Sequence, residues 1–305
     1  MVNICDLYRA MTTPELSFRS LSPITPKLDR YGYLVTYAQN NALVAQANLG
    51  DALVAIKCYI SPRENISTIL STEDVNSSRL LVPSHLYNDE LIVMQGDGVE
   101  CSADVVISPW ISGGTLNEAI TAAVRSGDVA TLAILAERFD RLALALLDAP
   151  FAHGDVKPEN IVIADDGELR LIDLDAMWTP ALTRCEELGT AEYQHPRRDA
   201  KLFGPHIDDY PIALISVALH ALAELPHLAV EGAVLPFDSG LVLGTNEAYC
   251  EACAQFRKSG NVTLQRLARQ LTKKSPIIDN LRVLIAELLK KYERKADPDT
   301  DCGCN

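Results

Sequence analysis

The sequence predicts an α+β protein in which a small sheet-rich part precedes a larger helical part. Up to about residue 115, short apolar runs such as ALVAQA and ALVAIKCYI alternate with turn residues such as NLGD and GDG. Such alternation is typical of antiparallel strands joined by hairpins. Beyond that point, the apolar residues recur with the period of amphipathic helices. The length of 305 residues is compatible with this division, because a domain usually contains about 150 residues.

The individual elements follow from the same patterns. The expected strands read YLVTY, ALVAQA, ALVAIKCYI, RLLVPSHLY, ELIVMQ and DVVISPWI, separated by QNN, NLGD, YNDE and GDG. The expected helices cover residues 115–126, 129–148, 209–224, 246–257, 262–272 and 276–292. Between the second and third of these helices, IVIADDGELRLID predicts a short hairpin around an Asp-Asp-Gly turn.

The composition restricts the possible partners and location. The net charge of −14 disfavours a nucleic acid or an anionic membrane as partner, because both attract basic surfaces. The N-terminal residues do not show the basic start and apolar run of a signal peptide. The most apolar stretch, IALISVALHALAELPHLAV, contains histidines, a glutamate and prolines, which favours a buried helix over a membrane span. We therefore expect a cytoplasmic protein.

The chain contains eight cysteines, and two close pairs could in principle supply a zinc site. Cys250 and Cys253 form a CxxC, and Cys302 and Cys304 form a CxC. The first pair lies in a helical pattern, and the second lies in a tail, DPDTDCGCN, with the composition of a disordered segment. Thiols that bind no metal are the favoured interpretation, with a structural zinc site as the alternative.

The stretch HGDVKPEN, residues 153–160, concentrates polar groups directly before the first strand of the predicted hairpin. A hairpin places the loop before its first strand beside the loop after its second, so Asp155, Lys157 and Asn160 should lie near Asp173. Asn160 and Asp173 offer oxygen ligands suited to Mg²⁺, Lys157 offers a cation, and Asp155 can accept a proton. Phosphoryl transfer requires this combination of groups.

These residues resemble the eukaryotic-type Ser/Thr protein kinases, a family with bacterial members. HGDVKPEN is similar to the catalytic loop H-R-D-x-K-P-x-N, LIDLD to the strand that ends in the D-F-G motif, and ALVAIK to the strand with the nucleotide-binding lysine. The resemblance covers about residues 31–225 and implies a bilobal protein-kinase-like fold with a small antiparallel-sheet N-lobe and a helical C-lobe. We expect an N-terminal extension over residues 1–30, the N-lobe over 31–112, the C-lobe over 113–295 and a disordered tail over 296–305.

The resemblance also implies roles for the polar residues and the cofactors ATP and Mg²⁺. Asp155 and Lys157 would be catalytic, and Asn160 and Asp173 would bind Mg²⁺. Lys57 would hold the α- and β-phosphates of ATP. A lysine at the end of an apolar strand is also commonly a solvated strand end, so this alternative stays open.

Other nucleotide-binding residues are implied by VVISPWISGGTL, which resembles the last N-lobe strand and the hinge. Ser108 would be the gatekeeper, and Pro109, Trp110 and Ile111 would present the adenine-facing backbone. Pro109 has no amide hydrogen, but its position needs only a carbonyl group. Glu64, early in a short helix after the lysine strand, is the preferred partner for the lysine, with a solvated helix start as the alternative.

The segment GTAEYQHP resembles the one that receives a protein substrate, with Thr190 near Asp155 and Lys157. Asp208, which opens the helix DDYPIALISVALHAL, resembles the buried aspartate that anchors the catalytic loop. A helix cap is the alternative role for Asp208. YQHPRR resembles segments of bacterial kinase-like proteins linked to phosphatases, which makes an associated phosphatase a candidate partner.

The sequence also departs from the kinase pattern. The expected glycine-rich loop reads YAQNNALV, with Tyr37, Gln39 and Ala42 at glycine positions, which puts phosphate binding by backbone amides in doubt. Gly154 replaces an arginine that usually receives an activation-loop phosphate, so switching of that kind is not expected. Asp175 replaces the glycine of D-F-G, and residues 195–197 read His-Pro-Arg in place of A-P-E.

Three functions agree with this pattern. The favoured one is an ATP-dependent kinase that acts on Ser or Thr hydroxyls of a protein still to be identified, because the base and metal residues are all present. The altered glycine loop, D-F-G and A-P-E favour a pseudokinase that regulates or scaffolds. A small-molecule kinase of the aminoglycoside or choline type shares H-G-D-x-x-x-x-N, but usually lacks Lys157 and the GTAEY segment.

Overall fold

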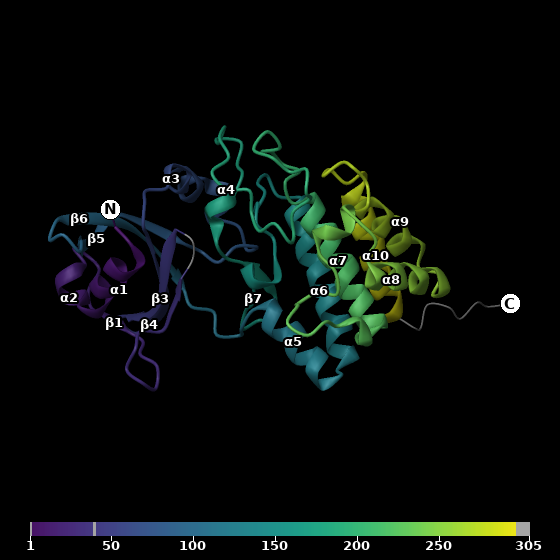
Figure 1. The fold of residues 1–305 in the computed structure, drawn as a ribbon, viewed down its shortest axis with the longest axis horizontal. Helices are drawn as coiled ribbons and strands as arrows, with labels where there is room; N and C mark the ends of the chain where they lie inside the picture. Colours follow the sequence, from purple (N-terminus) through teal and green to yellow (C-terminus); the bar gives the residue numbers. More distant parts are fainter. Residues whose placement is uncertain (1, 39–40, 297–305) are drawn as a thin grey trace. The chain divides into compact units, whose positions relative to one another are not determined.

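The protein divides into two compact units in the computed structural model, which describes residues 2–38 and 41–296. The units are Met1–Ile111 and Ser112–Asn305. The first contains a sheet with short helices, and the second is mostly helical (Figure 1). The expected α+β class is therefore confirmed. Of the tail expected over residues 296–305, all but the first residue lies outside the described part of the chain.

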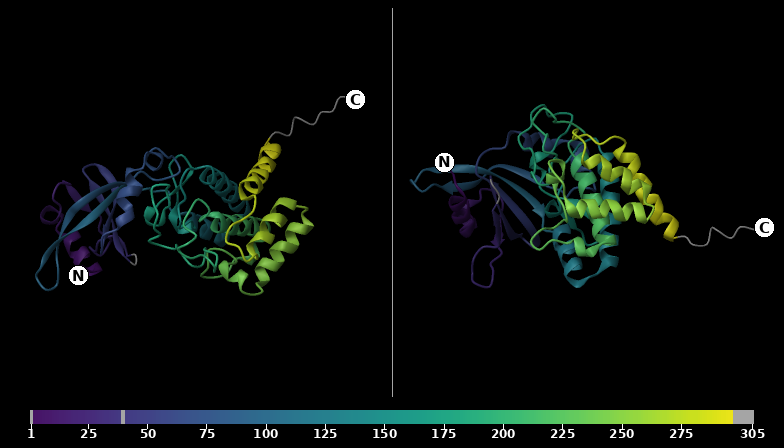
Figure 2. Two further views of the ribbon diagram at one scale, coloured as in Figure 1. Left: turned by 90° about the horizontal axis from the view of Figure 1, so that it is seen from above. Right: turned by 45° about the vertical axis from the view of Figure 1, so that its right-hand side comes forward.

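The sheet of the first unit, coloured purple to blue in Figure 2, is antiparallel throughout. Its strand order is β1-β3-β4-β6-β5, and β2 also pairs with β3. Residues 1–30, expected as an extension, supply an edge strand of this sheet, because β1 pairs with β3. The strands are β1 (Ile24–Pro26), β2 (Thr36–Ala38), β3 (Ala42–Leu49), β4 (Ala52–Tyr59), β5 (His85–Met94) and β6 (Glu100–Pro109).

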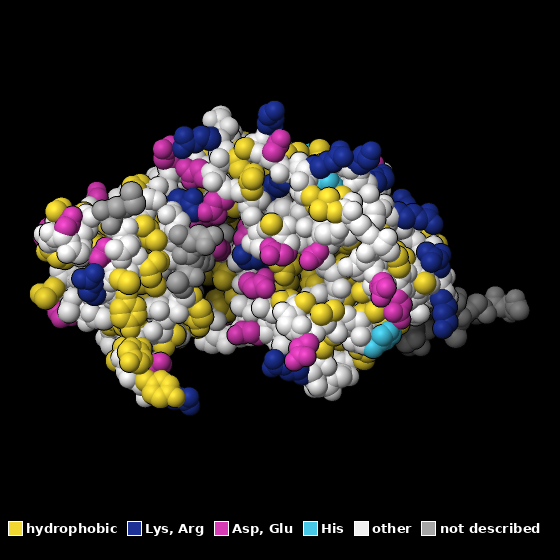
Figure 3. Space-filling model, in the orientation of Figure 1, with side chains coloured by type: hydrophobic (Ala, Val, Ile, Leu, Met, Phe, Trp, Pro, Cys, Tyr) yellow, Lys and Arg dark blue, Asp and Glu magenta, His cyan; other side chains and the backbone are white. Residues whose placement is uncertain are grey.

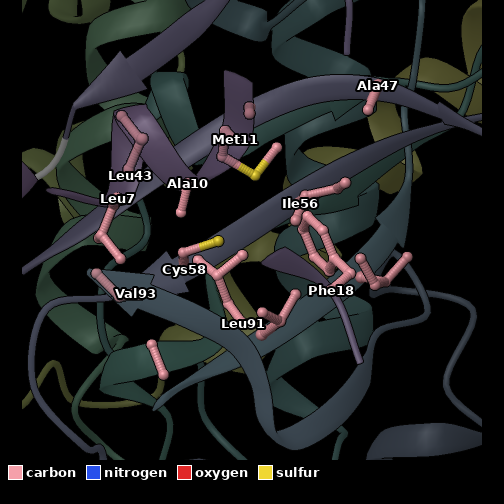
Figure 4. Close-up of a cluster of buried hydrophobic side chains, with 14 of the residues drawn as sticks. Leu7, Ala10, Met11, Phe18, Leu43, Ala47, Ile56, Cys58, Leu91 and Val93 are labelled. Atoms are coloured by element: carbon pink, nitrogen blue, oxygen red, sulfur yellow. The ribbon is translucent and has the colours of Figure 1, made fainter. Parts of the chain in front are cut away.

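Helices cover both faces of this sheet. Successive side chains of a strand point to opposite faces, so the burial pattern assigns each helix to a face. The helix α1 (Ile4–Thr12), with the segment around α2 (Pro14–Ser17), packs on one face, and α3 (Glu64–Ser71) packs on the other, followed by α4 (Glu73–Asn76). Figure 4 shows the cluster of buried side chains between α1, the segment around α2 and the sheet, in which helix residues contact alternate residues of the strands. Its members include Leu7, Ala10, Met11, Phe18, Leu43, Ala45, Ile56, Cys58, Leu91 and Val93.

The strand β5 differs from the prediction. YNDE was expected to separate two strands, but β5 continues through it with an irregular register between Tyr87 and Leu91. Asp89 has a φ of 52° there, a conformation that Asp adopts more easily than most residues. Its amide donates to Asp104 Oδ1 at 2.8 Å, and its carboxylate accepts from Ser102 Oγ at 2.6 Å. These bonds to the neighbouring strand stabilise a β-bulge in place of a turn.

The second unit is built around α7 (Asp209–Glu224), which is buried along almost its whole length. The helices α6 and α9 pack against α7, and α10 packs against α6 and α9. The predicted hairpin is present as β7 (Ile161–Ile163) and β8 (Leu169–Leu171). The other helices are α5 (Leu116–Ser126), α6 (Val129–Leu147), α8 (Glu247–Lys258), α9 (Val262–Leu271) and α10 (Leu281–Ala296), with single turns at Pro158–Asn160, Leu174–Ala176, Pro226–Leu228 and Ser239–Val242.

The last helix begins later than the residue 276 expected for it. Pro276 has no amide hydrogen, and Asn280 has a left-handed φ of 58° directly before the helix. The amide of Ile278 donates instead to Asp209 Oδ2 at 3.2 Å. Burial raises the pKa of Asp209 to about 6. A bond to another helix therefore holds residues that were predicted to form the first turn.

Within the described residues, the structure contains no helix with both the length and the apolar character needed to cross a bilayer. Acidic side chains lie on the visible face of both units (Figure 3), as expected from the net charge of −14.

Cys58 belongs to the core of the first unit, and its burial raises the thiol pKa to about 12, so it behaves as an apolar side chain. Cys250 and Cys253 lie on α8, whereas Cys302 and Cys304 lie outside the described residues.

Candidate functional site

The loop of residues 153–160 is held at its start by Asp208, which lies directly before α7. Asp208 Oδ2 accepts a hydrogen bond from the amide of His153 at 2.5 Å, and Oδ1 accepts one from the amide of Gly154 at 2.8 Å. Asp208 is only 2% exposed. Burial raises its pKa above the usual value, while His153 and the two amide hydrogen bonds act in the opposite direction. The carboxylate thus satisfies two buried backbone donors of the loop.

Asp155 is the centre of the polar cluster. Its Oδ2 accepts a hydrogen bond from Asn160 Nδ2 at 2.9 Å and lies 3.0 Å from Lys157 Nζ. Its Oδ1 accepts from the amide of Thr190 at 2.6 Å, and Lys157 Nζ donates to Thr190 Oγ1 at 2.7 Å. The side chain of Asp155 keeps 13% of its surface exposed. The structure therefore brings four of the predicted site residues together.

The hairpin places the end of its second strand beside this loop. The amide of Ile172 donates to the carbonyl of Asn160 at 2.9 Å, and His153 Nε2 lies 2.9 Å from the carbonyl oxygen of Ile172. Asp173 follows with a φ of 68° and a ψ of 76°, a left-handed conformation that costs about 1–3 kcal/mol in a residue other than glycine. Such strain is common where a side chain must be aimed at a ligand.

The donor set at this position fits Mg²⁺, which uses one or two carboxylates and completes its shell with phosphate and water oxygens. Across the described residues, no three or more His, Cys, Asp or Glu side chains form a group suited to a metal ion. A magnesium ion bound here would need Asp173, the amide oxygen of Asn160 and oxygens of a bound phosphate as ligands. The Nδ2 of Asn160 already faces Asp155, which leaves the Oδ1 on the other side of the amide group.

Gly154 has a structural reason for lacking a side chain. Its φ is 82°, and a Cβ atom there would lie 2.0 Å from the carbonyl oxygen of Ala176. The carbonyl oxygen of Gly154 accepts two side-chain hydrogen bonds, from Arg198 Nη1 at 2.9 Å and Gln194 Nε2 at 3.2 Å. Neither Arg198 nor Gln194 was predicted from the sequence as part of this site. Their only signal was the segment YQHPRR itself, which has no spacing that would connect it to residue 154.

His195 gives the changed A-P-E segment a connection to the C-terminal helices. Its Nε2 lies 3.0 Å from the carbonyl oxygen of Lys273, and its Nδ1 accepts from the amide of Arg197 at 3.0 Å. Burial lowers the pKa of His195 below its usual value, the bond to Lys273 raises it, and Arg197 lowers it again. A neutral ring that donates to Lys273 agrees with these contacts.

The remaining predicted site residues belong to the first unit. Lys57 lies in β4 between Val44 and Val106, with its ammonium group 5.3 Å from the ring centre of Tyr59. Glu64 is the first residue of α3.

The predicted hinge lies at the end of β6. Ser108 and Pro109 are its last residues, and they pair with Ala55 and Val54 of β4. The amide of Trp110 donates to the carbonyl of Leu53 at 3.0 Å, and Ile111 is the last residue of the first unit.

Of the residues at the glycine-loop positions, Gln39 lies outside the described part of the chain. Tyr37 lies in β2 and stacks on the ring of Trp110, with ring centres 5.8 Å apart and planes at 27°. An aromatic side chain at one glycine position thus contacts the predicted hinge within the same unit.

Comparisons with known proteins give a distant and partial match. No protein-family model matches the chain. A stretch of 138 residues is 31% identical to "Serine/threonine-protein kinase PknL" of two Mycobacterium tuberculosis strains and of Mycobacterium bovis. The match covers 43% of this chain and 34% of the kinase, so the chain spans about a third of the length of the curated relatives it matches. This similarity supports a kinase-like relationship.

Proposed function

We propose that the protein is a phosphotransferase of the Ser/Thr protein kinase type, with a bilobal fold, which uses Mg-ATP to phosphorylate a Ser or Thr hydroxyl of a protein. The observation that carries the proposal is the arrangement around Asp155, whose carboxylate contacts Lys157, Asn160 and Thr190. The similarity to a mycobacterial kinase supports it independently. In this proposal the N-lobe corresponds to residues 31–112 and the C-lobe to residues 113–295.

The proposed chemistry assigns one task to each polar group. The acceptor hydroxyl would hydrogen-bond to Asp155, which takes its proton while the acceptor oxygen forms a bond to the γ-phosphorus. The bond from that phosphorus to the β–γ bridging oxygen breaks, and ADP leaves. Lys157 would stabilise the negative charge of the transferred group, because its ammonium lies 3.0 Å from Asp155 Oδ2 and reaches the acceptor side of the cluster. Mg²⁺, when held by Asn160 and Asp173, would neutralise the phosphates.

In the same proposal, the first unit supplies the nucleotide contacts. Lys57 would hold the α- and β-phosphates with Glu64 as its partner, and residues 108–111 would form the adenine-facing edge. The loop that replaces the glycine-rich motif would cover the phosphates less tightly, because Tyr37 cannot bring its backbone as close to a ligand as glycine can.

A pseudokinase is the second candidate, and Asp175 is the observation that favours it. Asp175 lies two residues after Asp173 in a single helical turn. Its carboxylate adds negative charge near the proposed metal site, and its position lacks the backbone freedom of glycine. A protein that binds nucleotide but transfers no phosphate would tolerate such a change.

The experiment that separates these functions compares wild type with Asp155→Asn and Lys57→Ala. Phosphate incorporation at millimolar Mg-ATP would be measured by mass spectrometry, and nucleotide affinity by calorimetry. We expect Asp155→Asn to keep its affinity and lose turnover by about 10²- to 10⁴-fold, because the substitution preserves size but removes the proton acceptor. Lys57→Ala should weaken nucleotide binding.

The control is Asp165→Asn, at an exposed aspartate in the turn of the β7–β8 hairpin. This variant should match wild type in both measurements. The kinase function is wrong if wild type transfers no phosphate to itself or to any supplied protein, or if Asp155→Asn transfers it equally well. Nucleotide binding without transfer would then point to the pseudokinase.

A further inference from the structure

We propose that Arg198 is a positioning residue that orients Asp155 through the carbonyl of Gly154, and that it does so without any phosphate on residues 189–198. The inference rests on the proposed function, since it concerns the regulation of the same site. It starts from a contact that the kinase pattern does not contain, the hydrogen bond of 2.9 Å from Arg198 Nη1 to the oxygen of Gly154.

The peptide group that joins Gly154 to Asp155 is hydrogen-bonded at both its oxygen and its N–H. Its oxygen accepts from both Arg198 Nη1 and Gln194 Nε2. Its N–H donates to His153 Nδ1 at 3.3 Å. A peptide group is planar, so fixing both its oxygen and its hydrogen fixes the direction in which the chain enters Asp155. Arg198 thereby influences where the carboxylate of Asp155 points.

Arg198 carries a buried positive charge. Arg198 is 9% exposed, and burial lowers its pKa from the usual value, while Asp208, Cys185 and Asp155 raise it. A buried guanidinium is costly unless nearby groups stabilise its charge. The carboxylate of Asp208 accepts from the amide of Gly154. The guanidinium of Arg198 donates to the carbonyl of the same glycine, so both backbone groups of Gly154 are bonded to charged side chains. Hydrogen bonds to charged groups are stronger than those between neutral ones.

The segment that carries Arg198 also contacts the carboxylate of Asp155. The amide of Thr190 donates to Asp155 Oδ1 at 2.6 Å, and the amide of Gln194 donates to the carbonyl of Thr190 at 3.2 Å. Gly189 lies so close that a Cβ atom there would be 2.5 Å from the oxygen of Gly154. Residues 189–198 thus contact both the backbone oxygen directly before Asp155 and the carboxylate of Asp155.

These contacts are made by backbone groups and unmodified side chains. The same segment also contacts residue 239, because the amide of Ser239 donates to the carbonyl of Glu192 at 2.8 Å, and Ser239 Oγ donates to the carbonyl of Ala191 at 2.8 Å. Backbone groups, Ser239 and the side chains of Gln194 and Arg198 therefore hold the segment. The segment needs no phosphate to lie against the catalytic loop.

The test compares Arg198→Met and Arg198→Lys with Arg197→Met, a control at the adjacent and exposed arginine. We expect Arg198→Met to lower kcat on the order of 10²-fold, because a small misplacement of a catalytic group has effects of that size. The KM for Mg-ATP should change by less than about threefold, since the nucleotide contacts are elsewhere. Arg198→Lys should recover part of the rate, because an ammonium can still donate to one carbonyl. Arg197→Met should match wild type.

A second readout, hydrogen exchange of peptides from residues 152–160, does not depend on activity. Exchange should be faster in Arg198→Met, intermediate in Arg198→Lys and unchanged in Arg197→Met, and treatment of wild type with a broad-specificity phosphatase should change neither kcat nor exchange. If wild type transfers no phosphate, the proposed function fails, and exchange alone decides the positioning role. Unchanged exchange in both Arg198 variants, or a loss of kcat that only follows the unfolded fraction, overturns that role. A loss of kcat or protection after phosphatase treatment overturns the phosphate-free part.

Discussion

Asp208 shows how a single carboxylate can fix a loop that lies more than fifty residues away in the chain. Both its oxygens accept from loop amides, at His153 and Gly154, and the side chain is almost fully buried. We expect Asp208→Ala to lower the free energy of unfolding by about 1–3 kcal/mol, because it leaves two buried donors unpaired. Urea titration would measure this, with Asp199→Ala, at an exposed aspartate, as the control. An unchanged unfolding midpoint for Asp208→Ala would contradict the anchoring role.

At the scale of residues, the residue pattern itself indicates contacts within a motif, and the resemblance to kinases added the more distant Thr190 and Asp208. Asp155, Lys157 and Asn160 are close in the chain, so a short loop keeps them together whatever surrounds it. Arg198 and Gln194 reach Gly154 from about forty residues further along the chain. After the turn that ends at Ala176, the path to these residues contains no helix or strand, so no periodic pattern fixes where it returns to the loop.

At the scale of elements, Glu90 joins the strand β5 to the chain that follows α2. Its carboxylate accepts from the amides of Ser20 and Leu21 at 2.7 and 2.8 Å and from Ser20 Oγ at 2.7 Å, and the residue is 4% exposed. Burial alone would raise the pKa of Glu90, but the hydrogen bonds from Leu21 and Ser20 outweigh it and place the pKa below its ordinary value of 4.5. The ionised carboxylate therefore stabilises the first unit.

This pKa shift has a definite pH dependence. Because the folded pKa lies below the unfolded one, the stabilisation is complete above the unfolded pKa and is lost as the pH falls through the folded pKa. We expect Glu90→Gln to unfold at lower urea concentration than wild type at pH 7, and the difference to shrink in acid. Urea titrations between about pH 3 and 7 would measure it, with Glu15→Gln, at an exposed residue of α2, as the control. A difference that stays constant with pH would show that Glu90 contributes through packing alone.

The elements themselves were predictable to different degrees. Most helices of the second unit lie within a few residues of their predicted ranges, because a long amphipathic pattern is read from the sequence directly. The bulge in β5 and the late start of α10 were not predictable. Each depends on a bond to another element, from Asp89 to β6 and from Ile278 to Asp209, which local propensity does not contain.

At the scale of the whole molecule, the chain forms two compact units that each have a core of their own. In the first unit, that core includes residues from the first thirty positions, which the kinase pattern leaves out. Leu7 and Met11 of α1 are fully buried against the sheet, and β1 adds a strand at its edge. The sequence pattern of α1 does not show this, because a short amphipathic helix looks the same whether it covers a sheet or a partner.

This arrangement predicts that a substitution in α1 weakens the first unit and leaves the second intact. Leu7→Ala removes a side chain that is 0% exposed and should lower the free energy of unfolding by about 2–5 kcal/mol. Leu16→Ala, at a leucine that is 74% exposed on α2, is the matched control and should have almost no effect. Hydrogen exchange resolved by peptide would show faster exchange in β3, β4 and β6 for Leu7→Ala, with α7 unchanged because none of its contacts are lost. Equal behaviour of the two variants would mean that the burial of Leu7 contributes little to the stability of the first unit.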